Sequence, residues 1–449
     1  MKPVKVALIG AGSRSFGPAT IRDVLLSAPL AERGVELVLM DKVEAHLGEV
    51  EGYAKHVCRQ LGHAAKVQST TDLERALDGA DFAVTAIEVQ RFLYWTQDYH
   101  LPRHYGFKQI FGENGGPGSL FHALRNMGPT VHIARTMERL CPQALLLNYT
   151  NPEHKLCEAV TRLTSIQAVG LCHGVFMGLR QLAQLLEIPQ EELDTAACGI
   201  NHFTFFQRLR HRTTGEDLYP RLRRIDLEGD ELAHWHDFGL GRVLLRRFGL
   251  WPSPGTNHYG EYIRWAEEFM ASELQYYYDP AEGHPWETGK IPDFVYTIDR
   301  VDTNRPPWRR PEAQPRKLEE LPLKASGELA APIMEALCCG VQHELAAVNV
   351  PNRGYIPELP EGLVVEVPAL ADAQGLHPCQ MEPLPEPVAA MIRVQASIHK
   401  LLVEAFAEGS KAKLLQALLL DPTVDSYRRA VALLEEMLRL QRDILPPLE

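Results

Sequence analysis

The stretch Val4-Lys5-Val6-Ala7-Leu8-Ile9-Gly10-Ala11-Gly12-Ser13-Arg14-Ser15 decides the fold of this 449-residue chain. A short apolar run ends in two closely spaced glycines, which predicts a first strand followed by a tight turn. Glycines at that point let the backbone approach a pyrophosphate, and the next helix offers its free N–H groups. Ser15 stands where a third glycine is usual. We therefore predict that Gly10, Gly12 and Ser13 bind a dinucleotide cofactor.

Short apolar segments alternate with helical segments through the first third of the chain. The alternation predicts parallel strands joined by right-handed helical crossovers. The later sequence becomes more helical, with one β-rich block before a run of C-terminal helices. The expected fold is α/β: a Rossmann-like doubly wound parallel sheet with a second, helix-rich mixed α/β lobe. We expect an NAD-binding domain over residues 1–198, and a lobe for substrate, metal and oligomerisation over residues 199–449.

Asp41 follows the second predicted strand. In dinucleotide-binding folds a carboxylate at that place accepts the ribose hydroxyls and disfavours a 2′-phosphate. The sequence therefore favours NAD over NADP.

Composition excludes several classes of partner. The formal net charge is −12 and there is no basic run, so we expect no nucleic-acid partner. No segment approaches the roughly 20 apolar residues of a membrane span, so we expect no membrane partner. Eight cysteines are scattered without the spacing of a disulfide framework. Reduced thiols and a cytoplasmic location are therefore expected.

Leu171-Cys172-His173-Gly174 and Gly199-Ile200-Asn201-His202 supply a thiol and an imidazole beyond the cofactor segment. Both groups bind divalent cations. Two protein ligands are too few for a structural zinc site, but they suffice where substrate oxygens complete the shell. Taken singly, Cys172 and His202 also fit an ordinary protein interior. His173 is a candidate hydrogen-bonding partner of the site or its acid.

Two further segments offer ligand-binding groups. Asn151, in Asn148-Tyr149-Thr150-Asn151-Pro152, has an amide that can both donate to and accept from a sugar hydroxyl, although Asn-Pro also marks a plain turn. Glu113 lies in the glycine-rich segment 111–118, which is either a surface loop or a loop that closes over a ligand.

In the same order along the chain, these motifs resemble the family 4 glycoside hydrolases, and the resemblance covers nearly the whole sequence. The matching segments are Gly10–Ser13, Asn148–Pro152, Gly170–His173, Gly199–His202, His258–Tyr262, Asn349–Gly354 and Val365–Pro368. The family is NAD-dependent and does not use the usual pair of carboxylates. Its members also hold a divalent metal, usually manganese.

The resemblance implies a redox-elimination route. Hydride leaves C3 of the sugar, the resulting ketone acidifies the proton on C2, and the aglycone then leaves C1. Water adds across the double bond and the hydride returns, so no net oxidation occurs.

The resemblance also implies residue roles. A phenol used as base needs a neighbouring metal to lower its pKa, because burial alone would raise it. Tyr262 is our choice for this base, and Tyr259, three residues earlier in the sequence, is a second candidate. The implied roles are metal ligation by Cys172 and His202, an acid at His173, a substrate amide at Asn151, the C2 base at Tyr262, and Glu113 making that tyrosine more basic.

The expected substrate class rests on two differences between this chain and the family members that act on 6-phospho-sugars. Members that act on 6-phospho-sugars carry Asn or Asp after the metal cysteine and an arginine for the phosphate, whereas this chain has His173 and, near the arginine position, Trp95. We therefore expect a small unphosphorylated α-glycoside. The segment at residues 258–262 is similar to α-galactosidases, and Cys172-His173-Gly174 to α-glucuronidases. An α-galactosidase is our first expectation, with α-glucuronidase or α-glucosidase as alternatives.

Family members are typically homo-oligomers, so we expect a dimer or tetramer. Two hypotheses from different classes stay open on the sequence. A lactate- or malate-type NAD dehydrogenase shares this kind of cofactor domain, but it needs a substrate arginine and a His-Asp pair without a metal cysteine. A non-catalytic sensor would only bind the dinucleotide.

Overall fold

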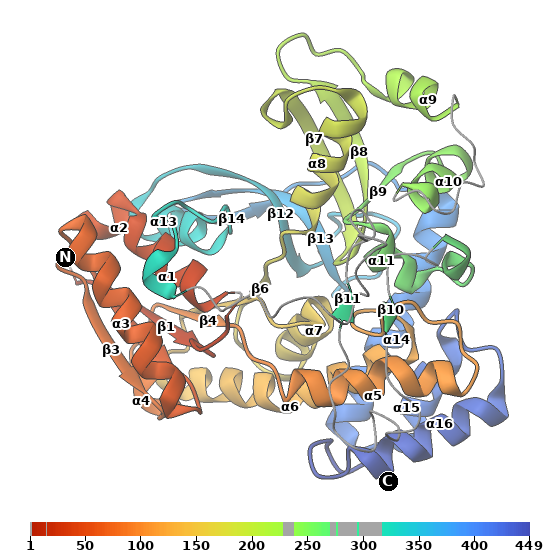
Figure 1. Cartoon of the computed structure of the whole chain (residues 1–449), viewed down its shortest axis with the longest axis horizontal. Helices are drawn as coiled ribbons and strands as arrows, with labels where there is room; N and C mark the ends of the chain where they lie inside the picture. The colour runs from red at the N-terminus through yellow and green to blue at the C-terminus, as the bar shows by residue number, and fades with distance from the viewer. Residues whose placement is uncertain (1, 15, 228–237, 270–274, 277–293, 296–316) are drawn as a thin grey trace, which may run out of the picture.

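A computed structural model describes residues 2–14, 16–227, 238–269, 275–276, 294–295 and 317–449. In these ranges one large mixed sheet runs through the molecule, with helices on both faces (Figure 1). None of the helices described is at once long and apolar enough to cross a bilayer.

The N-terminal half of the sheet is parallel, in the order β3-β2-β1-β4-β5-β6. The chain reverses its direction of strand addition between β1 and β4, which is the doubly wound order of dinucleotide-binding folds. The expected Rossmann-like sheet is therefore confirmed. Its strands are β1 (Val4–Ile9), β2 (Val35–Met40), β3 (Lys66–Thr70), β4 (Phe82–Thr85), β5 (Leu145–Asn148) and β6 (Ala168–Gly170).

Helices connect these strands and cover both faces of the sheet. They are α1 (Gly17–Leu26), α2 (Ala28–Arg33), α3 (Glu44–Leu61), α4 (Leu73–Leu77), α5 (Arg91–His104), α6 (Gly116–Leu140), α7 (Glu153–Leu163) and α8 (Gly174–Leu186). Side chains alternate between two hydrophobic clusters along each strand: Val6 and Leu8 of β1 join one, and Ala7 and Ile9 join the other. Burial on both faces explains why the inner strands such as β1 and β4 are continuous apolar runs, whereas the edge strand β3 is polar and only partly buried.

The sheet does not end at β6 but continues with antiparallel strands, in the order β6-β12-β13-β7-β8-β9. The second lobe therefore shares a sheet with the first. One strand, β7, contains the predicted division between residues 198 and 199, and that division stays a prediction. The strands are β7 (Leu193–Ile200), β8 (Phe203–His211), β9 (Trp251–Ser253), β12 (His343–Pro351), β13 (Val364–Asp372) and β14 (Gly375–Pro378), with a separate pair β10 (Gln275–Tyr276) and β11 (Phe294–Val295).

The second lobe also contributes helices, some of which pack against the first lobe. They are α9 (Tyr219–Leu227), α10 (Gly239–Phe248), α11 (Thr256–Tyr259), α13 (Ala330–Cys339), α14 (Glu386–Glu408), α15 (Lys411–Leu420) and α16 (Tyr427–Leu440), with short 3₁₀ turns η1 (Gln190–Glu192), η2 (Gly260–Tyr262), η3 (Ala266–Phe269) and η6 (Leu318–Glu320). The C-terminal helices α14 to α16 lie against α5 and α6 (Figure 1). There, Arg125 and Asp98 form a wholly buried ion pair at 2.7 Å, which ties α6 to α5.

Candidate functional site

The predicted site residues gather at one edge of the sheet, beyond the carboxyl ends of the parallel strands. Gly10 follows β1, Asp41 follows β2, Asn151 comes three residues after β5, and Cys172 comes two residues after β6. Ligands of open α/β sheets bind at this edge because the strand order reverses there and leaves a crevice.

The turn after β1 is held by Asp41. The N–H of Gly12 donates to Asp41 Oδ2 at 2.9 Å, and the N–H of Val43 donates to Asp41 Oδ1 at 2.9 Å. A Cβ at Gly12 would lie only 2.6 Å from the side chain of His46 and 2.8 Å from Asp41 Oδ2, so this contact requires glycine. The structure brings Gly12 and Asp41 together as a cofactor site needs.

A further position without room for a side chain lies at the start of α1. Ser15 lies outside the described residues, but a Cβ at Gly17 would stand 2.1 Å from the carbonyl oxygen of Ala11. Gly17 therefore provides the tight helix-to-strand packing that a third glycine usually supplies. Ser13 closes the turn, because its N–H donates to the carbonyl oxygen of Gly10 at 2.9 Å.

Asn151 lies half-buried at the end of the turn after β5, and its carbonyl oxygen accepts from Asn126 Nδ2 at 3.1 Å. The neighbouring Asn148 is structural. Its side chain accepts from Thr85 Oγ1 at 2.8 Å and donates to the carbonyl oxygen of Thr150 at 3.0 Å. Of the two asparagines, Asn151 is the one placed to meet a ligand.

His202 lies in the tight turn between β7 and β8, with a left-handed φ of 64°. Its Nδ1 is 3.0 Å from Asn114 Nδ2 and 3.1 Å from Nδ1 of His258. Burial lowers the pKa of His202 well below its usual value and that of His258 to about 4. Both imidazoles are therefore neutral at physiological pH, which is the form that ligates metals.

Glu113 is buried against the same two imidazoles. One ligand atom each from Glu113, His202 and His258 all lie within 4.8 Å of one another, and we call these three residues the Glu-His-His cluster. Burial acts to raise the pKa of Glu113, but the Arg91 guanidinium, at 2.6 Å, outweighs it and holds that pKa below its usual value. The cluster therefore holds one anionic and two neutral donors.

Glu261 holds the glycine-rich loop in place. Its carboxylate accepts from the main-chain N–H of Glu113 at 2.7 Å and from that of Asn114 at 3.1 Å. Lys155 Nζ donates to the carbonyl oxygen of Asn114 at 2.6 Å. Residues 111–118 are therefore a buried loop, held at the main-chain N–H groups of Glu113 and Asn114 and at the carbonyl oxygen of Asn114. The sequence alone did not decide between a surface loop and a loop that closes over a ligand.

Cys172 lies half-buried and is not one of the three members of the cluster. The Gly174 N–H donates to its sulfur at 3.3 Å. Burial, with Glu366 nearby, raises the pKa of the Cys172 thiol, and the Asn201 side chain partly offsets this. The thiol and the turn carrying His202 are thus linked through Asn201.

His173 is exposed and directly follows Cys172. Its Nδ1 lies 3.4 Å from Glu328 Oε1, and its ring is 6.4 Å from that of Phe16 at the start of α1. The Glu328 side chain is only 16% exposed, so it is well placed to orient the imidazole. No sequence motif pointed to Glu328, which is more than 150 residues from His173.

Tyr262 is fully buried below the loop. Its hydroxyl lies 3.1 Å from the carbonyl oxygen of Asn201 and 3.3 Å from that of Asn114, which share its one hydrogen, and its ring stacks on Phe203 at 5.1 Å. Burial and nearby carboxyls raise its pKa well above the usual value. The Tyr259 hydroxyl instead pairs with Thr256 at 3.1 Å. Of the two tyrosines, Tyr262 is the one beside the His202 turn.

The donor chemistry fits a divalent cation. Two neutral imidazoles, a carboxylate and a thiol are common ligands of zinc and of transition metals. Two buried amide oxygens next to them, Asn114 Oδ1 and Asn201 Oδ1, have no hydrogen-bond partner in the described part of the chain. Such orphaned acceptors favour a ligand that brings positive charge or donors into the site.

The position near Trp95, where relatives that act on phosphorylated sugars carry an arginine, is filled by the buried tryptophan. Trp95 is buried and donates from Nε1 to the carbonyl oxygen of Phe111 at 3.2 Å. The nearby cation is Arg91, stacked over Trp95 at 4.8 Å, and it is engaged by Glu113 at 2.6 Å and Glu88 at 3.5 Å. A guanidinium committed to two carboxylates is a poor phosphate receptor.

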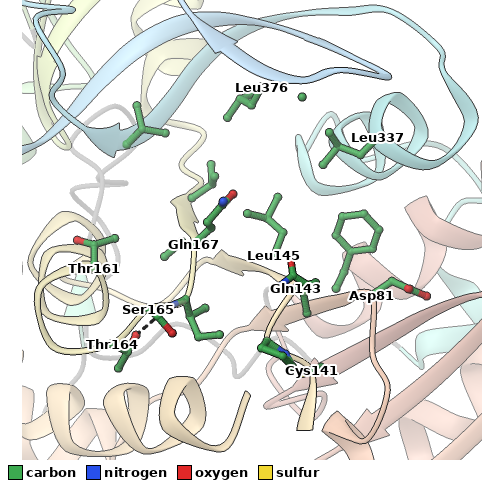
Figure 2. Close-up of a pocket in the computed structure, with 18 of the residues that line it drawn as sticks. Asp81, Cys141, Gln143, Leu145, Thr161, Thr164, Ser165, Gln167, Leu337 and Leu376 are labelled. Carbon is green, nitrogen blue, oxygen red and sulfur yellow. Dashed lines mark hydrogen bonds between the residues drawn. The ribbon is translucent and has the colours of Figure 1, made fainter. Parts of the chain in front are cut away.

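A large cavity of about 1000 Å³ lies at the opposite edge of the sheet (Figure 2). Its lining includes Phe82, Leu145 and Ala168, the first residues of β4, β5 and β6. Figure 2 shows Gln167 and Leu337 on opposite walls. None of the predicted site residues is among its lining residues, so size alone does not mark the site.

Together the doubly wound sheet, the Gly12–Asp41 turn and the neighbouring metal-type donors define a Rossmann-type dinucleotide enzyme with a cation site. The family description "Family 4 glycosyl hydrolase" matches residues 5–188, and its C-terminal domain matches residues 197–424. The chain therefore belongs to family 4 of the glycosyl hydrolases, and it is an enzyme. Membership sets aside the dehydrogenase and sensor hypotheses.

Individual relatives match along their whole length. An alpha-glucosidase of Erwinia rhapontici is 33% identical over 475 residues, covering 98% of each chain. An alpha-galactosidase of Bacillus subtilis (strain 168) is 29% identical, covering 98% of this chain and 99% of the relative. Alpha-galacturonidases also match, one from Thermoanaerobacter italicus at 27% identity, covering 98% of this chain and 97% of the relative.

Solved structures share the fold. A putative glucosidase from Bacillus subtilis superposes with a TM-score of 0.78 at 23% identity, covering 97% of this chain and all of its counterpart. A 6-phospho-alpha-glucosidase from gut microorganisms, in complex with NAD and Mn²⁺, gives 0.77 at 22% identity over the full length of both chains.

Proposed function

We propose that this enzyme hydrolyses unphosphorylated α-glycosides, α-galactosides first, by NAD-dependent oxidation at C3, deprotonation at C2 and elimination at C1. The observation that carries the proposal is the convergence at one sheet edge of a dinucleotide-type turn and metal-type donors in a family 4 chain. The curated relatives named alpha-galactosidase and alpha-glucosidase support the α-glycoside class.

We propose NAD and Mn²⁺ as the cofactors. Gly10, Gly12 and Ser13 would meet the pyrophosphate, and Asp41 the ribose. Cys172 and His202 would hold the cation. A bound divalent cation supplies positive charge that stabilises developing negative charge on substrate oxygens and lowers the pKa of nearby acids.

The protein's own groups then divide the remaining work. Asn151 would bind a sugar hydroxyl as donor and acceptor. His173, exposed and paired with Glu328, would give a proton to the departing glycosidic oxygen. Tyr262 would take the C2 proton. Glu113 would keep negative charge beside the site, because Arg91 holds it ionised.

The preference for an unphosphorylated sugar rests on the ion pairs of Arg91, which stacks on Trp95. Arg91 is paired with Glu113 and Glu88, so a dianionic phosphate at C6 would have to compete with two carboxylates. A neutral hydroxymethyl group at C6 faces no such competition. Relatives named alpha-galacturonidase keep a uronide as the second candidate substrate, and α-glucuronides and α-glucosides follow as further candidates.

We also propose a cytoplasmic homo-oligomer. All eight cysteines are free, and Cys58, Cys141, Cys157 and Cys198 are buried. Free thiols suit a reducing compartment.

The test is turnover of a panel of p-nitrophenyl α-glycosides that varies the configuration at C4 and the oxidation state at C6. The proposal predicts nitrophenol release that needs both Mn²⁺ and NAD⁺ in the presence of a thiol, without net NADH accumulation. Release that survives removal of both cofactors, or stoichiometric NADH, contradicts it. The ranking of galactoside, glucoside and uronide within the panel fixes the substrate.

A further inference from the structure

We infer that His258 is a third protein ligand of the catalytic cation, sharing it with His202, and that Glu113 faces the same cation. This inference rests on the proposed metal-dependent function. It adds an imidazole to the Cys172 and His202 pair that the sequence motifs indicate.

The first argument is the distance between the two rings. His202 Nδ1 and His258 Nδ1 lie 3.1 Å apart, with ring centroids at 4.4 Å and planes at 72°. Metal–nitrogen bonds of about 2.0–2.1 Å place two nitrogens bound at right angles about 3 Å from each other. The imidazoles therefore already have the spacing of two ligands of one ion.

The second argument is the hydrogen-bond balance at His202. A neutral imidazole nitrogen with a lone pair accepts one hydrogen bond, and here Asn114 Nδ2 at 3.0 Å and His258 Nδ1 at 3.1 Å both face His202 Nδ1. Asn114 Oδ1, on the same amide, has no partner in the part of the chain described. A cation between the two rings would take both imidazole lone pairs, so that His202 Nδ1 and His258 Nδ1 would need no shared proton to lie 3.1 Å apart.

The third argument is charge. Glu113 is 4% exposed and within 4.8 Å of both rings, so it offers a carboxylate to the same point. Arg91 pairs with Glu113 Oε1 and thereby keeps the buried carboxylate in its anionic form. An anionic oxygen beside two neutral imidazoles offsets part of the charge of a divalent cation.

The local fold makes this arrangement persistent. His258 lies in α11 and Tyr262 in η2, which follows it directly. Glu261, between them, binds the main-chain N–H groups of Glu113 and Asn114. The segment that carries His258 is thus fastened to the loop that carries Glu113, and both face the turn that carries His202.

The test counts the imidazoles bound to Mn²⁺ by pulsed EPR, through the hyperfine coupling of directly ligated nitrogen, in the full-length protein with Mn²⁺ alone as the probe. Wild type should show two coupled nitrogens, and His258→Asn and His202→Asn should each show one. His377→Asn, an exposed histidine of β14, is the matched control and should keep two. One nitrogen in wild type, or two in His258→Asn, overturns the inference.

Calorimetric titration with Mn²⁺ gives a second readout. His258→Asn should raise the Kd by more than about 100-fold, beyond the roughly 10- to 100-fold cost of losing a residue that only hydrogen-bonds a ligand. His258→Gln guards against a folding defect in the Asn variant, and both should keep the wild-type circular dichroism. A Kd within tenfold of wild type in both folded variants contradicts the inference.

Glycosidase assays on the same preparations separate the two proposals. If wild type turns over with Mn²⁺ and NAD⁺ but shows one nitrogen, the His258 assignment fails and the proposed function stands. If wild type neither binds Mn²⁺ nor turns over, both fail.

Discussion

The hydroxyl of Tyr262 donates to the carbonyl oxygen of Asn201 at 3.1 Å, so the proposed base is hydrogen-bonded to the residue directly before His202, the proposed metal ligand. The contact spans 61 positions of sequence. It places the phenol next to the proposed cation site, where a bound cation would oppose the effect of burial on its pKa.

Tyr262→Phe should therefore slow exchange of the substrate C2 proton with solvent by at least about 100-fold, the usual contribution of a general base. The ring and its stacking on Phe203 are kept, so folding should survive. Exchange is followed by NMR with NAD⁺ and Mn²⁺ present. Tyr259→Phe, the same change on a hydroxyl bonded to Thr256, should keep most of the rate. Loss of exchange in Tyr259→Phe alone would reassign the base.

Asp41→Ala should weaken NAD⁺ binding by about 10- to 100-fold, because it removes hydrogen bonds to a charged group worth about 1.5–3 kcal/mol. It also releases the N–H groups of Gly12 and Val43. Fluorescence titration with NAD⁺ measures the effect. Asp72→Ala removes a similar carboxylate from the N-terminus of α4 and should leave NAD⁺ affinity unchanged. Equal affinity in both variants would remove Asp41 from the cofactor site.

Glu366 should make the metal-free protein less stable as pH rises. It is buried, it accepts from Asn349 Nδ2 at 3.1 Å, and burial raises its pKa to about 7. The folded state binds this proton more tightly than the unfolded state, so the stabilisation is complete below about pH 4.5 and is lost as pH rises through about 7. The loss is at most about 3.5 kcal/mol, at about 1.4 kcal/mol per pH unit.

Thermal unfolding with a chelator between pH 5 and pH 8 checks this. Glu366→Gln keeps a neutral side chain at every pH and should show a smaller fall in Tm than wild type. Glu361→Gln makes the same change on an exposed residue and should follow wild type. Parallel curves for wild type and Glu366→Gln would show that the carboxyl is ionised throughout.

The cofactor half of the fold could be predicted from the sequence because its signals are local. β1 and the turn after it lie within ten residues, and the strand predicted directly before Asp41 is β2, which ends at Met40. The predicted run of C-terminal helices begins with α14 at Glu386. The antiparallel continuation of the sheet was not expected, since it joins β6 to β12 across more than 170 residues.

The site divides in the same way. Cys172 and His202 stand out by residue type next to predicted strand ends. His258 and Glu328 do not, because their partners His202 and His173 lie 56 and 155 positions away, and only the folded chain brings them together. Glu113 was expected to make Tyr262 more basic; it lies against His202 and His258, and it is one of the carboxyls that raise the pKa of Tyr262.

Hydrolysis of the preferred α-glycoside in D₂O tests the central claim most directly. If C2 is deprotonated and then reprotonated from solvent, the released sugar carries deuterium at C2, and its incorporation requires both NAD⁺ and Mn²⁺. Mass spectrometry and NMR of the product read this out. A sugar released at full rate with no deuterium at C2 would show that the glycosidic bond is cleaved by direct displacement, and would contradict the account.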